Sequence, residues 1–349
     1  MITSILIVVF LIILLFPLLV KKVEHNIELF LLVVGVATVT LSHLFGPERL
    51  WSPALLESAL VEPVKITATT LVFGLLFRAF REPLKRSIVR LERAMGPQLF
   101  AFLLILALGL LSSVITAIIG ALVLCEVVSA LSLDKKYETR MVILACFSIG
   151  MGAALTPVGE PLSTIAVAKL RGGAYDTDFL FLLRLLGVYV LPGVVVVSLV
   201  GAFLRGKEVS RGESLNEDFA EPAAQILKRA GLVYVFVAAL VLLGTGFKPI
   251  IDSHISRLSA GLLYWVNMSS AVLDNATLAA AELGPQMTAG QVKGILMGII
   301  ISGGMLIPGN IPNIIAANKL KISSRAWAVL GAPFGLVLMG LYYVILYLL

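Results

Sequence analysis

The feature that most constrains this chain is a pair of polar, proline-containing interruptions, each set within apolar sequence. Ser112 precedes Pro157 by 45 positions, and Ser269 precedes Pro308 by 39 positions. Proline lacks a backbone N–H and clashes with the preceding turn, so each proline cluster must end one helix and begin another. The duplication predicts a chain built from two related halves.

The composition places these interruptions in a membrane. Hydrophobic residues make up 59% of the 349 residues and charged residues 14%, which is more apolar surface than a soluble fold of this size buries. A membrane-spanning helix needs about 20 apolar residues. We therefore expect an all-α polytopic membrane protein. Uncharged or nearly uncharged stretches are 2–20, 27–45, 98–125, 179–204, 229–247 and 326–349.

Charge in the connecting segments predicts the topology. Basic residues cluster at 78–93, which we place in the cytoplasm, and acidic residues at 48–62, which we place outside together with the N-terminus. The expected organisation is therefore sequential. It comprises N-terminal scaffold spans at 1–63, a first inverted repeat at 64–204, a cytoplasmic linker at 205–228 and a second inverted repeat at 229–349.

Within each repeat we expect a re-entrant helical hairpin followed by a broken transmembrane helix. As one straight helix, 98–133 would reach about 54 Å, far beyond a bilayer, so a hairpin is predicted there. The broken helix at 141–170 follows it. The second repeat is expected to contain a hairpin at 257–284 and a broken helix at 293–320. The first hairpin opens inward and the second outward, so the repeats are predicted to be inverted.

The interruptions gather groups suited to ion binding. A helix N-terminus carries about half a positive charge and a C-terminus about half a negative charge. Hydroxyl and amide oxygens are hard donors suited to Na⁺. Ser, Thr, Gly and Pro also favour close helix packing in lipid, an alternative that stays open for any single residue. The candidate ligands are Ser112, Ser113, Thr116, Thr156, Ser269, Ser270, Asn275, Thr277, Asn310 and Asn313.

Acidic residues in the apolar segments are more informative, because an ionised carboxylate is costly to bury unless it is paired or hydrated. Asp274 is expected to bind Na⁺ and to exchange a proton, with helix capping as the alternative. Glu160 is expected either to cap the following half-helix or to bind Na⁺. Glu126 is a candidate proton relay, or else faces a cytoplasmic vestibule. Glu282 is expected to be solvated near the external end of its hairpin.

Other chemistries lack the residues that they need. The three histidines, His25, His43 and His254, fall in predicted loops or at span ends, which argues against a histidine-dependent hydrolase or metal centre. No phosphate-binding loop is visible, and the net charge of +6 reflects connecting segments rather than nucleic-acid binding. Cys125 and Cys146 read as buried small hydrophobes. We expect no cofactor beyond transported Na⁺ and H⁺.

These motifs resemble the ion transporter superfamily, which includes arsenite permeases, NhaD-type sodium/proton antiporters and divalent-anion/sodium symporters. Residues 270–277 are similar to the Asp-Asn hairpin motif of the NhaD and arsenite permease branches, and 157–164 and 308–313 occupy the place of the broken-helix motif. The resemblance covers 64–349 and looks closest to a short prokaryotic branch of cation transporters. The first turn has no Asp-Asn pair, and neither turn carries the Ser-Asn-Thr signature of carboxylate symporters.

The resemblance implies a multi-pass homodimer in the cytoplasmic (inner) membrane of a prokaryote, whose partners are the lipid bilayer and small ions. The favoured hypothesis is a Na⁺/H⁺ antiporter working by alternating access, because a carboxylate that binds either ion exchanges them by competition. The alternative is Na⁺-coupled transport of a carboxylate or an inorganic oxyanion. A membrane-embedded enzyme or a non-transporting sensor is a third, less favoured hypothesis.

Overall fold

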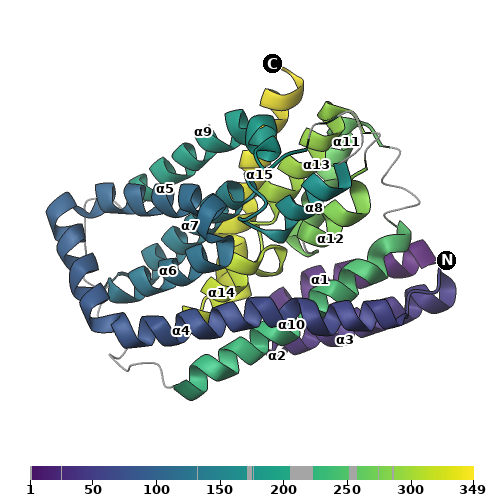
Figure 1. Cartoon of the computed structure of the whole chain (residues 1–349), viewed down its shortest axis with the longest axis horizontal. Coiled ribbons are helices and arrows are strands. Elements are labelled where there is room, and N and C mark those ends of the chain that lie inside the picture. The colour runs from purple at the N-terminus through teal and green to yellow at the C-terminus, as the bar shows by residue number, and fades with distance from the viewer. Residues whose placement is uncertain are drawn as a thin grey trace.

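The computed structural model describes residues 2–24, 26–131, 133–170, 175, 177–204, 223–250, 258–273, 275–284 and 287–349. The regular secondary structure of these described residues is helical throughout, without a strand. Figure 1 shows α7 (Lys135–Ala153) between α5 (Pro97–Ile115) and α6 (Ala117–Ala130).

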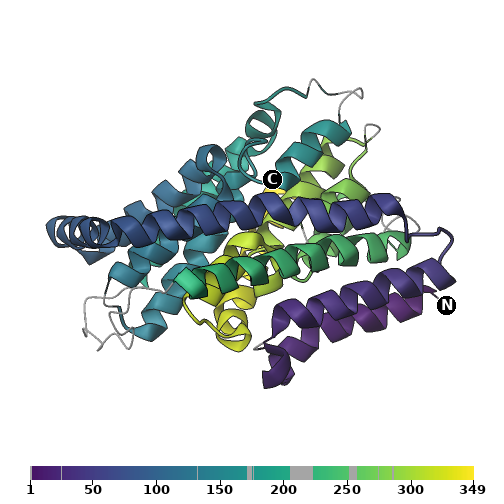
Figure 2. The same cartoon turned by 60° about the horizontal axis from the view of Figure 1, so that its bottom comes forward.

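Long N-terminal helices form one flank of the molecule together with α10. Figure 2 shows them lying side by side, and contacts join α3 to α10, α4 to α10 and α1 to α3. Their bounds are α1 Ile2–Leu19, α2 Lys21–Glu24, α3 Ile27–Phe45, α4 Pro53–Met95 and α10 Ala223–Ile250.

The polar contacts of α10 show that it runs antiparallel to α4. The hydroxyl of Tyr234 donates to the carbonyl oxygen of Leu60 at 2.7 Å. Farther along α10, Lys248 pairs with Glu48, just before α4, at 2.6 Å. The end of α10 and the connection between α3 and α4 therefore lie at the same side of the molecule.

Two series of helices make up the rest of the structure. The first unit comprises α5 Pro97–Ile115, α6 Ala117–Ala130, α7 Lys135–Ala153, α8 Pro161–Leu170 and α9 Phe181–Phe203. The second unit comprises α11 Ala260–Val266, the 3₁₀ turn η2 Asn267–Ala271, α12 Asn275–Glu282, α13 Ala289–Ser302, the 3₁₀ turn η3 Ile307–Gly309, α14 Ile311–Lys319 and α15 Ser324–Tyr347.

The two units repeat one order of elements. In each, two helices are joined at a turn, an interrupted pair of helices follows, and a long helix closes the series. The contacts between the units are reciprocal, since α6 packs against α14 and α8 against α12. The interruptions expected at the two proline clusters are confirmed, because α7 and α13 both stop before them and α8 and α14 begin inside them.

Helix α7 is the centre of the apolar core. Every residue from 141 to 153 is buried, including Phe147, whose ring meets that of Phe334 of α15 edge-on at 5.1 Å. Helices α5, α6, α9, α14 and α15 all contact α7. A helix that is apolar all round needs this kind of enclosure.

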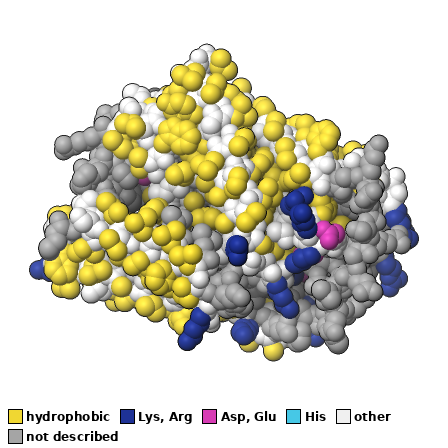
Figure 3. Space-filling view, turned by 180° about the vertical axis from the view of Figure 1, so that it is seen from behind, with side chains coloured by type: hydrophobic (Ala, Val, Ile, Leu, Met, Phe, Trp, Pro, Cys, Tyr) yellow, Lys and Arg dark blue, Asp and Glu magenta, His cyan; other side chains and the backbone are white. Residues whose placement is uncertain are grey.

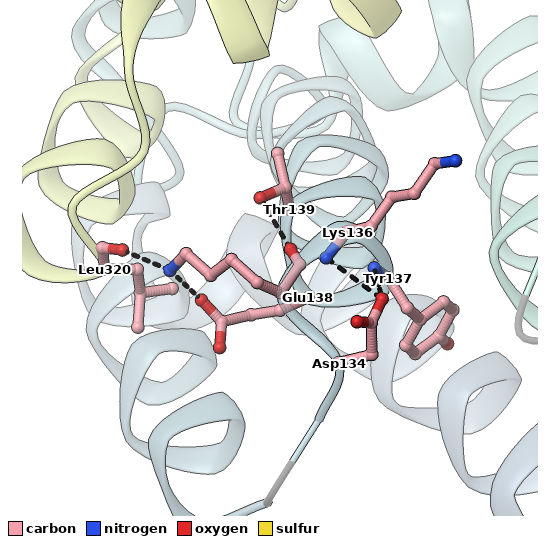
Figure 4. Close-up of polar contacts among 7 residues, drawn as sticks. Asp134, Lys136, Tyr137, Glu138, Thr139 and Leu320 are labelled. Carbon is pink, nitrogen blue, oxygen red and sulfur yellow. Dashed lines mark hydrogen bonds and ion pairs between the residues drawn. The ribbon is translucent and has the colours of Figure 1, made fainter. Parts of the chain in front are cut away.

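The start of α7 is fastened by a small polar network (Figure 4). The carboxylate of Asp134 accepts hydrogen bonds from the backbone N–H groups of Lys136 and Tyr137, both at 3.1 Å, and so caps the helix. The ammonium of Lys135 lies 2.5 Å from a carboxylate oxygen of Glu138 and 2.8 Å from the carbonyl oxygen of Leu320. The beginning of α7 is therefore tied to the end of α14.

The surface is that of a helical membrane protein, as predicted. Figure 3 shows hydrophobic side chains spread over most of one face, with Lys and Arg gathered toward one end. Large apolar residues such as Val188 and Val337 are 70% and 72% exposed. Five helices are long and apolar enough to cross a bilayer, over Glu28–Phe45, Pro97–Ile115, Phe181–Phe203, Ile226–Pro249 and Ser324–Tyr347.

Three segments expected as connections are helical in whole or in part. Of the acidic segment 48–62, the residues from Pro53 onward form the start of α4, with Ser52 as its N-cap. The basic segment 78–93 continues α4, because most of its residues are straight-chain or apolar helix formers that keep the helix going. Helix α10 begins at Ala223, so positions 223–228 of the expected linker are also helical, and 205–222 lie outside the described residues. The limits of the two repeats stay predictions.

Candidate functional site

The interruption between α13 and α14, residues 303–310, is here called the second break. Asn313 lies just inside α14, is fully buried, and donates through its amide nitrogen to the carbonyl oxygens of Gly303 and Leu306, both at 2.8 Å. Two carbonyl oxygens that follow the end of α13 thus accept hydrogen bonds from a side chain of the next helix, α14. The amide oxygen of Asn313 itself has no hydrogen-bond partner.

The turn between η2 and α12 lies against the second break. The hydroxyl of Ser270 donates to the amide oxygen of Asn275, and both side chains are buried. A Cβ added to Gly303 would lie 2.8 Å from that amide oxygen, and one added to Gly309 would lie 2.7 Å from the carbonyl oxygen of Ser270. The predicted residues Ser270, Asn275 and Asn313 are therefore brought together by glycines that permit the close approach.

The interruption between α7 and α8, residues 154–160, is the first break, and it is bound to the turn between α5 and α6. The hydroxyl of Thr156 donates to the carbonyl oxygen of Ser113. The backbone N–H of Ala117 donates to the carbonyl oxygen of Gly159 at 2.9 Å. The first break and its neighbouring turn thus form a cluster comparable to that of the second unit.

Thr116 makes the turn between α5 and α6 by itself. Its φ of 75° and ψ of 149° lie in a region that residues other than glycine rarely occupy. Its hydroxyl oxygen accepts a long hydrogen bond, 3.4 Å, from the N–H of Ile119 and caps α6. The turn is therefore sharp, and it is held by its surroundings.

The serines before this turn have a local role. Ser112 donates to the carbonyl oxygen of Leu108 at 2.5 Å, and Ser113 donates to that of Leu110 at 2.7 Å. Both bonds lie within α5, so each serine hydroxyl donates to a backbone carbonyl oxygen of its own helix. A Cβ on Gly120 would lie 2.7 Å from the Ser112 hydroxyl oxygen, so this serine also mediates close helix packing. The observed contacts of Ser112 and Ser113 therefore agree with a role in close helix packing, the alternative to ion binding.

The two units meet at the second break. A Cβ on Gly150 of α7 would lie 2.8 Å from the amide nitrogen of Asn310, which is 7% exposed. The thiol of Cys146 lies 3.8 Å from the carbonyl oxygen of Pro312. Asn310 is therefore placed against the core helix of the first unit, whereas the hydrogen bonds of Ser112, Ser113, Thr116 and Thr156 stay within that unit.

Hydrogen-bond satisfaction differs between the two units. Most buried polar atoms in proteins have a partner. Among the described residues between positions 267 and 313, five buried side-chain atoms have none: Asn267 Oδ1, Ser269 Oγ, Asn275 Nδ2, Glu282 Oε1 and Asn313 Oδ1. The second unit is therefore the better candidate for a binding site.

Comparison with known proteins assigns the chain to a family. A family model described as "Protein of unknown function (DUF1646)" matches residues 3–349. The chain belongs to the DUF1646 family. A search of the curated proteins found no match. The resemblance to the ion transporter superfamily stays a prediction.

The acidic candidates of this DUF1646 chain differ in their surroundings. Glu160 is 7% exposed directly before α8, which fits both a cap and a ligand. Glu126 of α6 forms an ion pair with Lys319, with side chains 13% and 9% exposed. The carboxylate of Glu126, the expected proton relay, is therefore paired with the ammonium of Lys319. Asp274 lies outside the described residues, and so does the side chain of Thr277.

The expectation that Glu282 is solvated was wrong. Its side chain is 3% exposed, and one carboxylate oxygen accepts a hydrogen bond from the amide of Asn267 at 2.7 Å. Packing of α12 against α8, α10 and α13 covers it. Asn267 was missed at the sequence level. Its position, two residues before Ser269 in an apolar segment, was the available signal.

The unpartnered oxygens are of a type that hard cations prefer. No group of three or more His, Cys, Asp or Glu side chains that could hold a metal ion occurs among the described residues. The unpartnered oxygens belong to amides, a hydroxyl and a carboxyl. Such oxygens suit hard cations, whereas zinc and copper select nitrogen and sulfur ligands.

Proposed function

We propose that this protein is a secondary active ion transporter, a Na⁺/H⁺ antiporter that works by alternating access. The observation that carries the proposal is the set of buried, unpartnered polar atoms around the second break. A buried polar group without a partner costs about 1–3 kcal/mol. A set of them near interrupted helices is accounted for if a ligand satisfies them.

The ligand groups follow from the interrupted helices. The amide oxygen of Asn313 and the hydroxyl of Ser269 offer hard oxygens, with Asn310 at the start of α14. Asp274 supplies a carboxylate that binds either Na⁺ or H⁺, so that the two ions compete and are exchanged. Glu160 is a second carboxylate ligand in the first break.

The architecture proposed for this function is a pair of inverted repeats. The α5–α6 and α11–α12 pairs are re-entrant hairpins, and α7–α8 and α13–α14 are broken spans. The repeated order of elements and the reciprocal contacts of α6 with α14 and of α8 with α12 support this proposal. The protein is a homodimer of the prokaryotic inner membrane, built through the spans before position 97, with neither enzymatic activity nor a resident cofactor.

One observation favours the alternative of Na⁺-coupled anion transport. The amide nitrogen of Asn275 is a buried hydrogen-bond donor without a partner, beside the second break. A donor suits a carboxylate or oxyanion oxygen, and helix N-termini add positive potential for one. A rise in melting temperature that needs both Na⁺ and such an anion would support this alternative.

The test is ion flux in proteoliposomes. The purified protein should dissipate an imposed proton gradient when Na⁺ is added, and Asp274→Asn should abolish most of this flux. Glu57→Gln, which changes an exposed glutamate of α4, is the matched control and should behave as the wild type. Absence of Na⁺-dependent proton flux in the wild type would contradict the proposed function. Unchanged flux in Asp274→Asn would remove Asp274 from the mechanism.

A further inference from the structure

A buried acid–amide pair, Glu282 with Asn267, lies in the second unit close to the second break. Glu282 is the last residue of α12, and Asn267 is the first residue of η2. The amide nitrogen of Asn267 donates to Glu282 Oε2 at 2.7 Å, and the two residues are 3% and 0% exposed. Glu282 Oε1 and Asn267 Oδ1 have no hydrogen-bond partner. The pair joins the elements on the two sides of the turn.

Among the described side chains, no cation pairs with this carboxyl group. The charged side chains on the helices packed against α12 are Lys169 of α8, Lys228, Arg229 and Lys248 of α10, and Lys293 of α13. Lys169 and Lys228 are exposed, Lys248 pairs with Glu48, and Lys293 lies over the ring of Tyr189 at 5.6 Å; the Arg229 side chain is not described. Within the described part of the chain, Glu282 forms no ion pair.

We infer that Glu282, held by Asn267, is a second proton-binding site beside Asp274, and that it takes up and releases a further proton during the exchange cycle. A buried carboxylate with one hydrogen bond and no paired cation is costly to keep ionised. A proton on Oε1 makes the group neutral, while Oε2 keeps its bond from Asn267. The proton comes from water on one side of the membrane and returns to water on the other, and only an O–H bond forms and breaks.

The pair is linked to the second break by direct contacts. The carbonyl oxygen of Asn267 accepts a hydrogen bond from the hydroxyl of Ser302 at 2.7 Å. Ser302 is the last residue of α13 and precedes Gly303, which packs against Asn275. A change of charge at Glu282 therefore acts on a residue that is bonded to the edge of the break. The binding of a proton at Glu282 does not depend on the proposed antiport, whereas the part of that proton in transport rests on it.

The experiment compares Glu282→Gln with Glu57→Gln in two measurements. Infrared difference spectra between acidic and alkaline pH report a protonated-carboxyl stretch without any transport. In the wild type and in Glu57→Gln we expect a protonated-carboxyl band that contains a component missing from Glu282→Gln. In proteoliposomes, Na⁺-dependent proton flux should fall to the level of empty liposomes in Glu282→Gln alone.

The possible outcomes separate this inference from the proposed function. A component of the carboxyl band lost in Glu282→Gln, with no Na⁺-dependent flux in the wild type, would support the proton site and contradict antiport. Wild-type flux and an unchanged band in Glu282→Gln would overturn the inference, as would a component lost only in Asp274→Asn. Should Glu282→Gln not fold, Glu282→Asp keeps the charge on a shorter side chain and should shift the pH dependence of flux. An unshifted profile would overturn the inference.

Discussion

At the scale of single residues, the ion pair between Glu126 and Lys319 shows how the two units are joined. It connects α6 of the first unit with the end of α14 of the second, and both side chains are nearly buried. Breaking a buried pair by removing one partner is strongly destabilising, because the other charge stays buried without compensation. Removing one partner of the pair therefore costs more stability than replacing both partners with apolar residues.

Lys319→Met should lower the free energy of unfolding by about 3 kcal/mol, measured by denaturant unfolding in detergent. The double variant Lys319→Met with Glu126→Leu should recover most of this loss. Lys169→Met is the matched control, since Lys169 holds the same place before a leucine in the first unit and is exposed; it should change stability by less than about 0.5 kcal/mol. Equal losses in Lys319→Met and Lys169→Met would contradict this account.

At the scale of elements, the turn between α5 and α6 depends on a strained residue. Thr116 holds a positive φ and also caps α6 through its hydroxyl. Such backbone strain costs about 1–3 kcal/mol in a residue with a side chain. Glycine occupies this region without that cost, and it loses only a few tenths of a kcal/mol as a cap.

Thr116→Gly should therefore raise the free energy of unfolding by about 1 kcal/mol, whereas Thr116→Ala, which keeps the strain and loses the cap, should lower it by about 1 kcal/mol. Thermal unfolding of both variants in one detergent checks the sign of each change. A loss of stability in both variants would show that the turn carries no strain that glycine relieves.

The elements were predictable where proline decides the backbone. Pro157 and Pro308 mark breaks that the structure has, and each is followed by a glycine and a second proline four residues later, whereas single prolines such as Pro192 lie inside a continuous helix. The length of α4 was not predictable from charge, since an Arg-rich segment continues a helix as readily as it forms a connection. The Glu282–Asn267 pair could not be foreseen either, because α12 packs against α8, which is distant in the sequence, as well as against α10 and α13.

At the scale of the whole molecule, polar contacts assign chain segments to two sides. The pair of Glu48 with Lys248 groups the α3–α4 connection with the end of α10. The bond from Lys135 to Leu320 groups the start of α7 with the end of α14. Basic residues are in excess at 78–93 and occur at 319, 321 and 325, so we expect from the positive-inside rule that both segments lie in the cytoplasm.

Single cysteines test this topology. In a background where Cys125 and Cys146, both buried, are replaced by alanine, Glu48→Cys should react with a membrane-impermeant maleimide on intact cells. Arg86→Cys and Arg325→Cys should react only after permeabilisation. Each replaces an exposed side chain, so accessibility should depend on the side of the membrane. Labelling of Arg86→Cys and Arg325→Cys from opposite sides would contradict the arrangement.

The unequal hydrogen bonding of the two units has a consequence for how the molecule could have diverged. In an architecture of two units, one unit can contain buried polar atoms that lack hydrogen bonds while the other unit packs against it. Here α7 of the first unit packs against the second unit, with Gly150 facing Asn310. Under the proposed function, we expect changes of ion specificity to arise mainly within residues 260–319. The sequences of the remaining helices are expected to vary only where their packing against residues 260–319 is kept.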